Sequence, residues 1–233
     1  MAGTPSWRFA VLLTPFQDRI AGIVSELPEA RGFALAGAGG LVVRGLIDRP
    51  TRDLDYFTVP GEERALVELR DALERAFESA GLACTRRRDL ATFVRLEVGD
   101  GDERCEIDLA IDYRAMPSEP SDYGPTLAVE ELAANKVLAL FDRAEARDFL
   151  DLVQLNRHFE MESLLDLASR KDTGFDTAGF LEALSSFGRF TAADFGIDQA
   201  EHDQLRATVA RWRSDLARSQ RREPPDRSQG LGR

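Results

Sequence analysis

A glycine turn between two predicted strands constrains the fold of this chain more than any other feature of its sequence. Residues 33–58 have the sequence FALAGAGGLVVRGLIDRPTRDLDYFT. It predicts an apolar strand at about 33–36, a short helix that opens at the glycines, and a second strand at about 53–58. Successive side chains of a strand point to opposite faces, so Asp53 and Asp55 project together, while Leu54 and Tyr56 point the other way. We therefore expect a sheet with an acidic site on one face.

The paired carboxylates predict a metal site. Two adjacent carboxylates repel each other unless a cation neutralises them, and Mg²⁺ accepts oxygen ligands from one or two carboxylates together with substrate phosphates. The glycines at 37, 39 and 40 carry no side chain, so backbone N–H groups can approach a phosphate closely. Asp-x-Asp alone also fits a solvent-facing strand end, but the glycine turn at this distance favours the metal site.

The rest of the chain is mixed α/β in its front half and helical in its back half. Apolar spacing predicts a helix at 7–29, a second helix ending at Gly81, and strands from 82 to 111 with a turn at 99–102. The last of these strands, CEIDLAID, carries a third carboxylate, Asp108. We expect a catalytic domain at 1–115, a helical domain at 116–217, and a disordered, proline- and glycine-rich tail at 218–233.

Composition narrows the functional classes. The net charge of −11 argues against a generic nucleic-acid coat protein, although Arg86, Arg87 and Arg88 form a local basic cluster. No apolar run approaches the ~18 residues that a membrane span requires. The two cysteines, Cys84 and Cys105, fit a reducing compartment. We therefore expect a cytoplasmic protein that does not enter a membrane.

Lys136 stands out because Lys171 is the only other lysine among 30 basic residues. A lysine kept in an apolar helical stretch suggests a need for its compact ammonium, and the alternative is a surface lysine. Asp148 and Asp151 share one helical face, and the alternative for them is a solvated ion-pair face with Arg147. A continuous helix would separate Lys136 from Asp151 by about 22 Å, at ~1.5 Å per residue. If they share a site, we expect the helix to break at about 142–145.

Taken together, these motifs resemble the nucleotidyltransferase fold and, within it, the AbiEii/AbiGii-type (MenT-like) nucleotidyltransferase toxins. Residues 33–58 and CEIDLAID resemble the glycine and acidic-strand motifs of that family. The helical sequence ELAANKVLALFDRAEARDFLDLVQL resembles the segment that follows the family's sheet, and the likeness covers about residues 30–215. It implies an α/β (α+β) fold: a mixed sheet with flanking helices, followed by a C-terminal helical bundle.

The resemblance also implies a function. The enzyme would use a nucleoside triphosphate (NTP) and Mg²⁺ to transfer a nucleoside monophosphate to an acceptor, the 3′ end of a tRNA. It would act as the toxin of a type IV-like pair with an antitoxin partner. Two alternatives stay open: an aminoglycoside-like small-molecule nucleotidyltransferase, which the acidic charge favours, and a catalytically inactive binding module. Intact Asp53, Asp55 and Lys136 argue against the inactive module.

Candidate site residues follow from the same resemblance. The metal and the nucleotide would be held by Asp53, Asp55, Gly39, Gly40, Thr51, Arg52 and Lys136, and one of Asp148 and Asp151 would complete the site. Asp108 is either the general base for the attacking hydroxyl or a cap at the sheet edge. The arginine cluster 86–88 either contacts phosphates of an RNA acceptor or forms a charged sheet edge. We therefore expect the acidic strand to face Lys136 across the nucleotide.

Overall fold

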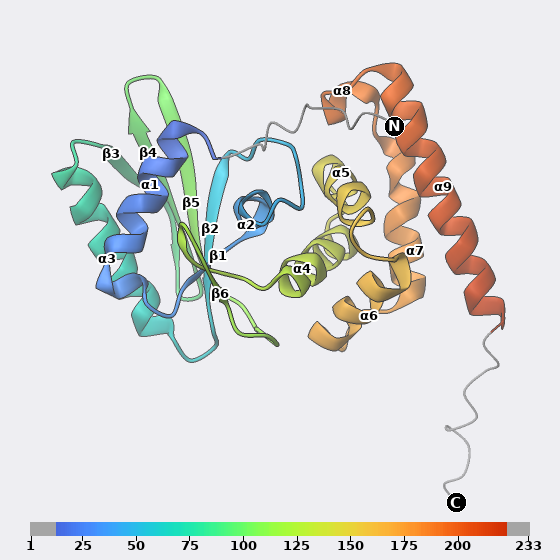
Figure 1. Cartoon of the computed structure of the whole chain (residues 1–233), viewed down its shortest axis with the longest axis horizontal. Coiled ribbons are helices and arrows are strands. Elements are labelled where there is room, and N and C mark those ends of the chain that lie inside the picture. The colour runs from blue at the N-terminus through green and yellow to red at the C-terminus, as the bar shows by residue number, and fades with distance from the viewer. Residues whose placement is uncertain (1–12, 223–233) are drawn as a thin grey trace, which may run out of the picture. The chain divides into compact units, whose positions relative to one another are not determined.

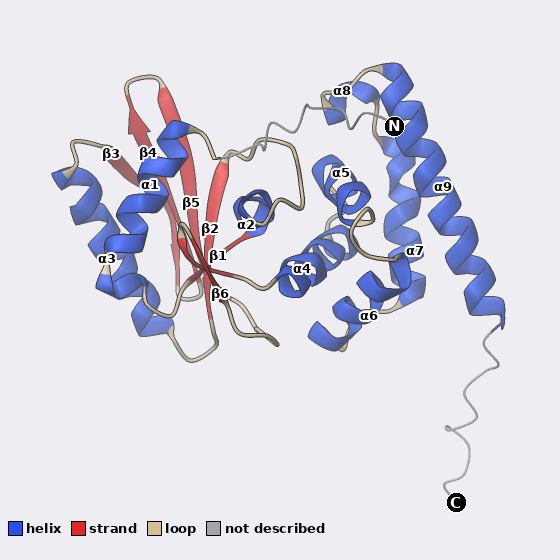
Figure 2. Cartoon of the chain, in the orientation of Figure 1, coloured by secondary structure: helices blue, strands red, loops and turns tan. Residues whose placement is uncertain are grey.

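The computed structural model describes residues 13–222, and the chain divides into two compact units between Asn135 and Lys136. Strands occur in the first unit, and the described part of the second is built from helices (Figure 2). No helix in the described range is long and apolar enough to cross a membrane. The sheet unit therefore extends past the boundary expected at residue 115.

The first unit is built on a mixed seven-stranded sheet, formed by the described residues in the order β3-β4-β5-β2-β1-β7-β6. Strand β1 pairs antiparallel with β2, and β2 pairs parallel with β5. The strands are β1 (Ala34–Ala36), β2 (Asp53–Thr58), β3 (Ala83–Leu90), β4 (Phe93–Asp100), β5 (Glu103–Ile111), β6 (Glu119–Ser121) and β7 (Gly124–Thr126). The helices are α1 (Pro15–Glu26), η1 (Pro28–Ala30), α2 (Gly37–Val43) and α3 (Glu63–Ser79).

The two faces of this sheet differ in burial. Alternate residues of the central strands, such as Leu54, Leu96 and Ile107, are fully buried. Helices α1 and α3 lie along the same side of the sheet (Figure 1) and bury their own apolar residues, such as Ile20 and Leu69. The intervening strand residues remain partly exposed. The sheet therefore has a buried core face. We call the opposite face, which carries Asp53, Asp55 and Arg95, the functional face.

The second unit is a set of helices with an aromatic core. Helix α4 (Val129–Asp142) crosses the boundary between the units. It is followed by α5 (Ala146–Leu155), α6 (Met161–Lys171), α7 (Thr177–Ser185), η2 (Ser186–Arg189), α8 (Ala192–Phe195) and α9 (Gln199–Arg222). Phe187 lies at the centre of the core, with ring centroids 5.3 Å from Phe149, 5.3 Å from Phe195 and 5.4 Å from His202.

The predicted elements differ from the observed ones mainly at their ends. The first helix begins at Pro15, after the N-cap Thr14, and residues 7–12 of its predicted span lie outside the described part of the chain. Helix α9 continues to Arg222, past the expected start of the tail at 218, and the rest of the tail lies beyond the described residues. The short strands β6 and β7 were not predicted, because each is three residues long and contains a proline.

Candidate functional site

Asp53 and Asp55 lie on the functional face of β2, and neither side chain is fully buried. Thr51, just before the strand, donates a hydrogen bond from its Oγ1 to Asp53 Oδ1 at 2.6 Å. Thr51 is buried, and its carbonyl oxygen accepts a hydrogen bond from Gln17 Nε2 at 2.9 Å. Hydrogen bonds to a charged acceptor are shorter and stronger than neutral ones. Helix α1 thus fixes Thr51, and Thr51 fixes the carboxylate of Asp53.

Gly37, at the start of α2, lies against Asp55. Its φ of +56° is in the left-handed region that glycine adopts freely. A Cβ atom here would lie 1.7 Å from Asp55 Oδ2, so a larger residue would displace the carboxylate. Gly39 and Gly40 are buried within α2, and a Cβ on Gly40 would lie 2.8 Å from Leu132 Cδ2. Gly37 is therefore the glycine beside the carboxylates, while close packing already requires a glycine at position 40.

Asp108 lies opposite Asp55 in the parallel pairing of β2 with β5. Arg95, on β4, donates two hydrogen bonds to it: Nε to Oδ1 at 2.7 Å and Nη2 to Oδ2 at 2.6 Å. Arg95 Nη1 also lies 3.3 Å from Glu106 Oε2. The hydrogen bonds to Asp108 are the main cause that raises the pKa of Arg95 above its ordinary value, and the charge of Asp53 contributes. Both oxygens of the third carboxylate are thus engaged by one guanidinium.

Sequence reasoning missed Arg95. Its importance depends on strand register, which places Arg95 opposite Asp108 and Asp108 opposite Asp55. The available signal was an arginine at an outward position of the alternating strand FVRLEV, opposite an acidic strand that the turn at 99–102 joins to it. Such a cross-strand pair is identified only when the register of the hairpin is specified.

Lys136 and Asp151 form a buried ion pair in the second unit. Lys136 Nζ lies 2.8 Å from Asp151 Oδ2 and 3.8 Å from Asp148 Oδ1. Both aspartates are completely buried, and Lys136 is 7% exposed. Lys136 is therefore not a surface lysine. The solvated ion-pair face expected as an alternative is also wrong, because Asp148 and Asp151 are completely buried.

The two aspartates have different partners. Asp148 accepts hydrogen bonds from Arg143 Nε at 3.0 Å and Nη2 at 2.9 Å. It also accepts one from the backbone N–H of Glu145 at 3.2 Å, which caps the first turn of α5. The ion pair of Asp151 is instead directed at the ammonium of Lys136. Asp148 therefore caps the first turn of α5, and Asp151 orients the ammonium of Lys136.

The carboxylates of β2 are the candidate metal ligands. Within residues 13–222, no three His, Cys, Asp or Glu side chains form a metal-binding group. Asp53 and Asp55 would therefore act as a pair, which fits Mg²⁺ because that ion completes its shell with water and substrate phosphates. Arg52 adds a nearby positive charge: it is exposed, and its guanidinium makes no hydrogen bond or ion pair with the described residues.

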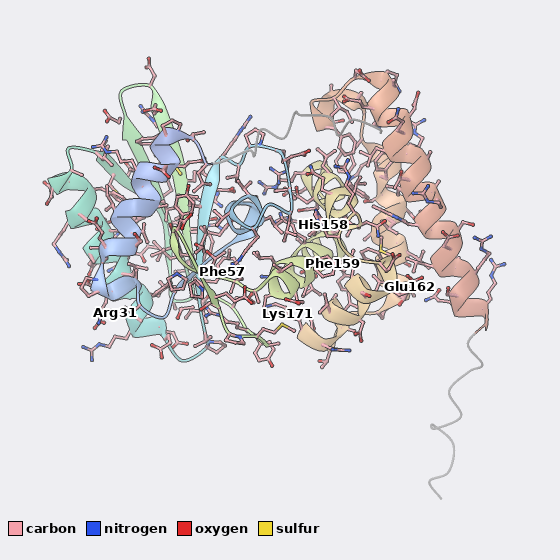
Figure 3. The ribbon with its side chains drawn as sticks, in the orientation of Figure 1. Arg31, Phe57, His158, Phe159, Glu162 and Lys171 are labelled. Carbon is pink, nitrogen blue, oxygen red and sulfur yellow. The ribbon has the colours of Figure 1, made fainter. Side chains whose placement is uncertain are left out.

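The histidines and cysteines contribute to structure. His158 follows α5 in the turn before α6 (Figure 3), and His202 is buried in the aromatic core. Burial raises the pKa of the Cys105 thiol to about 12, and it raises that of Cys84 to about 11. Both thiols are therefore protonated at neutral pH and are poor nucleophiles.

The sequence was compared with models of known protein families, with curated proteins and with solved structures. Residues 20–230 match the model of a family described as "Nucleotidyl transferase AbiEii toxin, Type IV TA system". No curated protein matches the sequence.

Several solved structures share the fold. MenT4, a nucleotidyltransferase toxin from Mycobacterium tuberculosis H37Rv, is 16% identical, with a TM-score of 0.60 over 91% of this chain and 83% of its own. A putative nucleotidyltransferase from Helicobacter pylori is 19% identical, with a TM-score of 0.55 over 87% of this chain and 96% of its own. JHP933, also from Helicobacter pylori, is 19% identical, with a TM-score of 0.53 over 88% and 93%. The expected nucleotidyltransferase fold is confirmed.

Proposed function

Since the chain belongs to the AbiEii nucleotidyltransferase toxin family of type IV toxin–antitoxin systems, we propose that it transfers a nucleoside monophosphate from an NTP to the 3′ end of a tRNA. The reaction depends on Mg²⁺ and releases pyrophosphate. The observation that carries this proposal is the arrangement on β2, where Asp53 and Asp55 share one face, Thr51 fixes the first carboxylate and Gly37 gives room to the second. A cognate antitoxin is the protein partner, and the site of action is the cytoplasm.

Asp53 and Asp55 hold the Mg²⁺ ion in this proposal. When bound, the metal neutralises charge that develops on the phosphates of the nucleotide. The chain's own contribution is to hold two carboxylates on one strand face in a fixed orientation. Thr51 limits the rotation of Asp53, and any side chain at position 37 would displace Asp55.

Positive groups bind the triphosphate. Arg52 supplies an exposed guanidinium directly beside Asp53, and Lys136 supplies an ammonium that Asp151 orients at 2.8 Å. An ammonium acts as a compact point charge, which suits contact with phosphate oxygens. Gly39 and Gly40 contribute through the conformation of α2, and Asp148 contributes by holding the start of α5.

Asp108 has a positioning role in this scheme. Arg95 binds both of its oxygens, and the pair lies one strand away from Asp55. Because both oxygens of Asp108 accept hydrogen bonds from one guanidinium, the carboxylate is held in one orientation. The Arg95–Asp108 pair therefore orders the functional face beside the metal ligands.

Transfer of label from an NTP tests the proposal. Wild-type protein, Mg²⁺, α-labelled NTPs and total tRNA are expected to give labelled tRNA. Asp53→Asn keeps the shape of the side chain but weakens metal binding, so the rate should fall by about a hundredfold or more, equivalent to several kcal/mol. Asp102→Asn, an exposed aspartate in the β4–β5 turn, is the matched control and should retain the wild-type rate.

The outcomes of this assay separate the alternatives. Label on an aminoglycoside instead of tRNA would replace the proposed acceptor with a small molecule. Equal transfer by wild type and Asp53→Asn would exclude the proposed metal site. An absence of NTP binding by the wild type would leave only the inactive binding module.

A further inference from the structure

The exposed face of β3 and β4 extends from the acidic strand as a row of paired residues. Strand register places Arg88 opposite Arg95, Arg95 opposite Asp108, and Asp108 opposite Asp55. With adjacent strands about 4.8 Å apart, β3 lies about 14 Å from β2 across the sheet. A molecule that reacts at the acidic strand and extends across this face therefore reaches Arg88.

The three arginines of the basic cluster differ in their partners. Arg86 forms a forked pair with Glu74, at 2.9 and 2.7 Å, and it also binds Asp89 at 2.7 Å. Arg87 binds Glu97 at 2.7 Å. Arg88 is exposed and makes no hydrogen bond or ion pair with the described residues. Two of the three charges are thus compensated within the protein, and the third is available to a ligand.

An aromatic ring lies beside the uncompensated arginine. The guanidinium carbon of Arg88 is 5.9 Å from the centroid of Phe93, and that of Arg95 is 5.7 Å from it. Phe93 is partly exposed at the start of β4, and its cross-strand neighbour Leu90 is 56% exposed. The edge of the sheet thus presents a partly exposed ring with two guanidinium groups over it.

The carboxylates beside Arg88 on this face pair with two other arginines. Glu97 pairs with Arg87, and both Glu106 and Asp108 pair with Arg95. The single guanidinium of Arg95 faces two carboxylates, so the row has no net positive charge, but Arg88 pairs with no carboxylate among the described residues and is open to an anionic ligand. A phosphate can pair with this guanidinium without displacing a carboxylate.

We propose that Arg88 and Phe93 form the acceptor subsite of the proposed nucleotidyltransferase and bind the single-stranded end of an RNA. A base stacks on the Phe93 ring, and Arg88 binds an adjacent phosphate. Aromatic side chains on a sheet combined with arginine are the usual means of binding single-stranded nucleic acid. The inference rests on the proposed function for the identity of the reaction, but binding at this subsite is measurable without any reaction.

The test measures RNA binding and transfer separately, on the full chain. Fluorescence anisotropy of a labelled single-stranded RNA oligonucleotide gives the dissociation constant without NTP. Phe93→Leu removes the ring and should weaken binding by about tenfold, within the range of one stacked base, while Phe93→Tyr should retain binding. Arg88→Ala should weaken binding and reduce the slope of log affinity against log salt by about 0.7, the loss of one phosphate contact.

Arg64→Ala is the control, because Arg64 is a highly exposed arginine on α3 that pairs with Glu68, one helical turn away. In transfer assays, Arg88→Ala and Phe93→Leu should raise the KM for RNA and leave the KM for NTP unchanged. The inference is overturned if wild type does not bind the oligonucleotide, or if Arg88→Ala and Phe93→Leu behave as Arg64→Ala does. RNA binding that depends on these residues, without any NTP-dependent transfer, would contradict the proposed function alone.

Discussion

At the scale of single residues, the hydroxyl of Thr51 controls the orientation of Asp53. The 2.6 Å hydrogen bond between them is short, and the buried Thr51 is itself held by Gln17. Thr51→Val keeps the shape and removes the donor, so the carboxylate gains freedom to rotate. Hydrogen bonds to charged groups contribute about 1.5–3 kcal/mol, so kcat/KM should fall by about 10- to 100-fold.

Thr51→Ser is the matched variant, because it restores a hydroxyl at the same position. It should retain most of the wild-type kcat/KM in the labelled-NTP assay. Equal losses in Thr51→Ser and Thr51→Val would show that the methyl group and its packing matter, and the positioning role of the hydroxyl would then be wrong.

Residue-scale prediction from sequence succeeds where the information is local. Alternation along β2 is sufficient to place Asp53 and Asp55 on one face, and the resemblance to the toxin family associates Thr51 with Asp53. It fails for Arg95, whose partner lies 13 positions away on a different strand. The sequence also cannot show which glycine is closest to a carboxylate, because that depends on the path of the chain between two strands.

At the scale of elements, the break between α4 and α5 is the decisive feature of the helical unit. A polar stretch interrupts the apolar pattern at 142–145, and the 15 residues from Lys136 to Asp151 could not otherwise bring their side chains together. The structure has this break, with Ala144 at a φ of 48° between the helices. Sequence alone did not choose between Asp148 and Asp151, since the two share one helical face and differ only in their tertiary partners.

Because Asp148 and Asp151 have different partners, we expect their substitutions to affect stability and NTP binding differently. Asp148→Asn removes the charge that the half-exposed Arg143 binds and weakens the cap of α5, so the free energy of unfolding should fall by about 1.5–3 kcal/mol, the usual contribution of hydrogen bonds to a charged group. Asp151→Asn leaves the buried ammonium of Lys136 without its ion pair, so it should also lower the free energy of unfolding, by about 3–5 kcal/mol, and in addition raise the KM for NTP.

Chemical denaturation and steady-state kinetics, both at a temperature where each variant is folded, separate these two effects. Lys136→Gln should reproduce the kinetic defect of Asp151→Asn, because the two residues act as a pair. If folded Asp148→Asn loses as much NTP affinity as Asp151→Asn, then Asp148 also belongs to the nucleotide site and the division of roles is incorrect.

At the scale of the whole molecule, the sequence predicts the class and order of the two parts better than their boundary. The strand and helix periodicities differ clearly between the front and back halves, which predicts a mixed sheet followed by helices. The expected boundary at 115 is too early for the observed sheet, since β6 and β7 add to it and the compact unit continues to Asn135. Short strands with proline carry almost no periodicity, so their pairing appears only in three dimensions.

Ligand binding should be visible in the stability of the whole chain. A ligand that binds only the folded state stabilises it by about 2.7 kcal/mol at a concentration of 100 times Kd. For a chain of this length, about 2–4 °C per kcal/mol gives a rise in Tm of roughly 5–10 °C. We expect this rise with Mg²⁺ and NTP together, and a smaller one with either alone, because the metal and the phosphates complete each other's coordination.

Variants distinguish specific stabilisation from a general effect of salt. Asp53→Asn should lose the part of the Tm rise that depends on Mg²⁺, and Lys136→Gln should lose part of the rise caused by NTP. Asp102→Asn, exposed in the β4–β5 turn, should show the full rise. Thermal scans with Mg²⁺, with NTP and with both, at constant ionic strength, measure the Tm rise that each ligand causes in each variant. An equal rise in all three variants would mean that the ligands stabilise the chain without using the proposed residues, and the assignment of Asp53 and Lys136 would then be wrong.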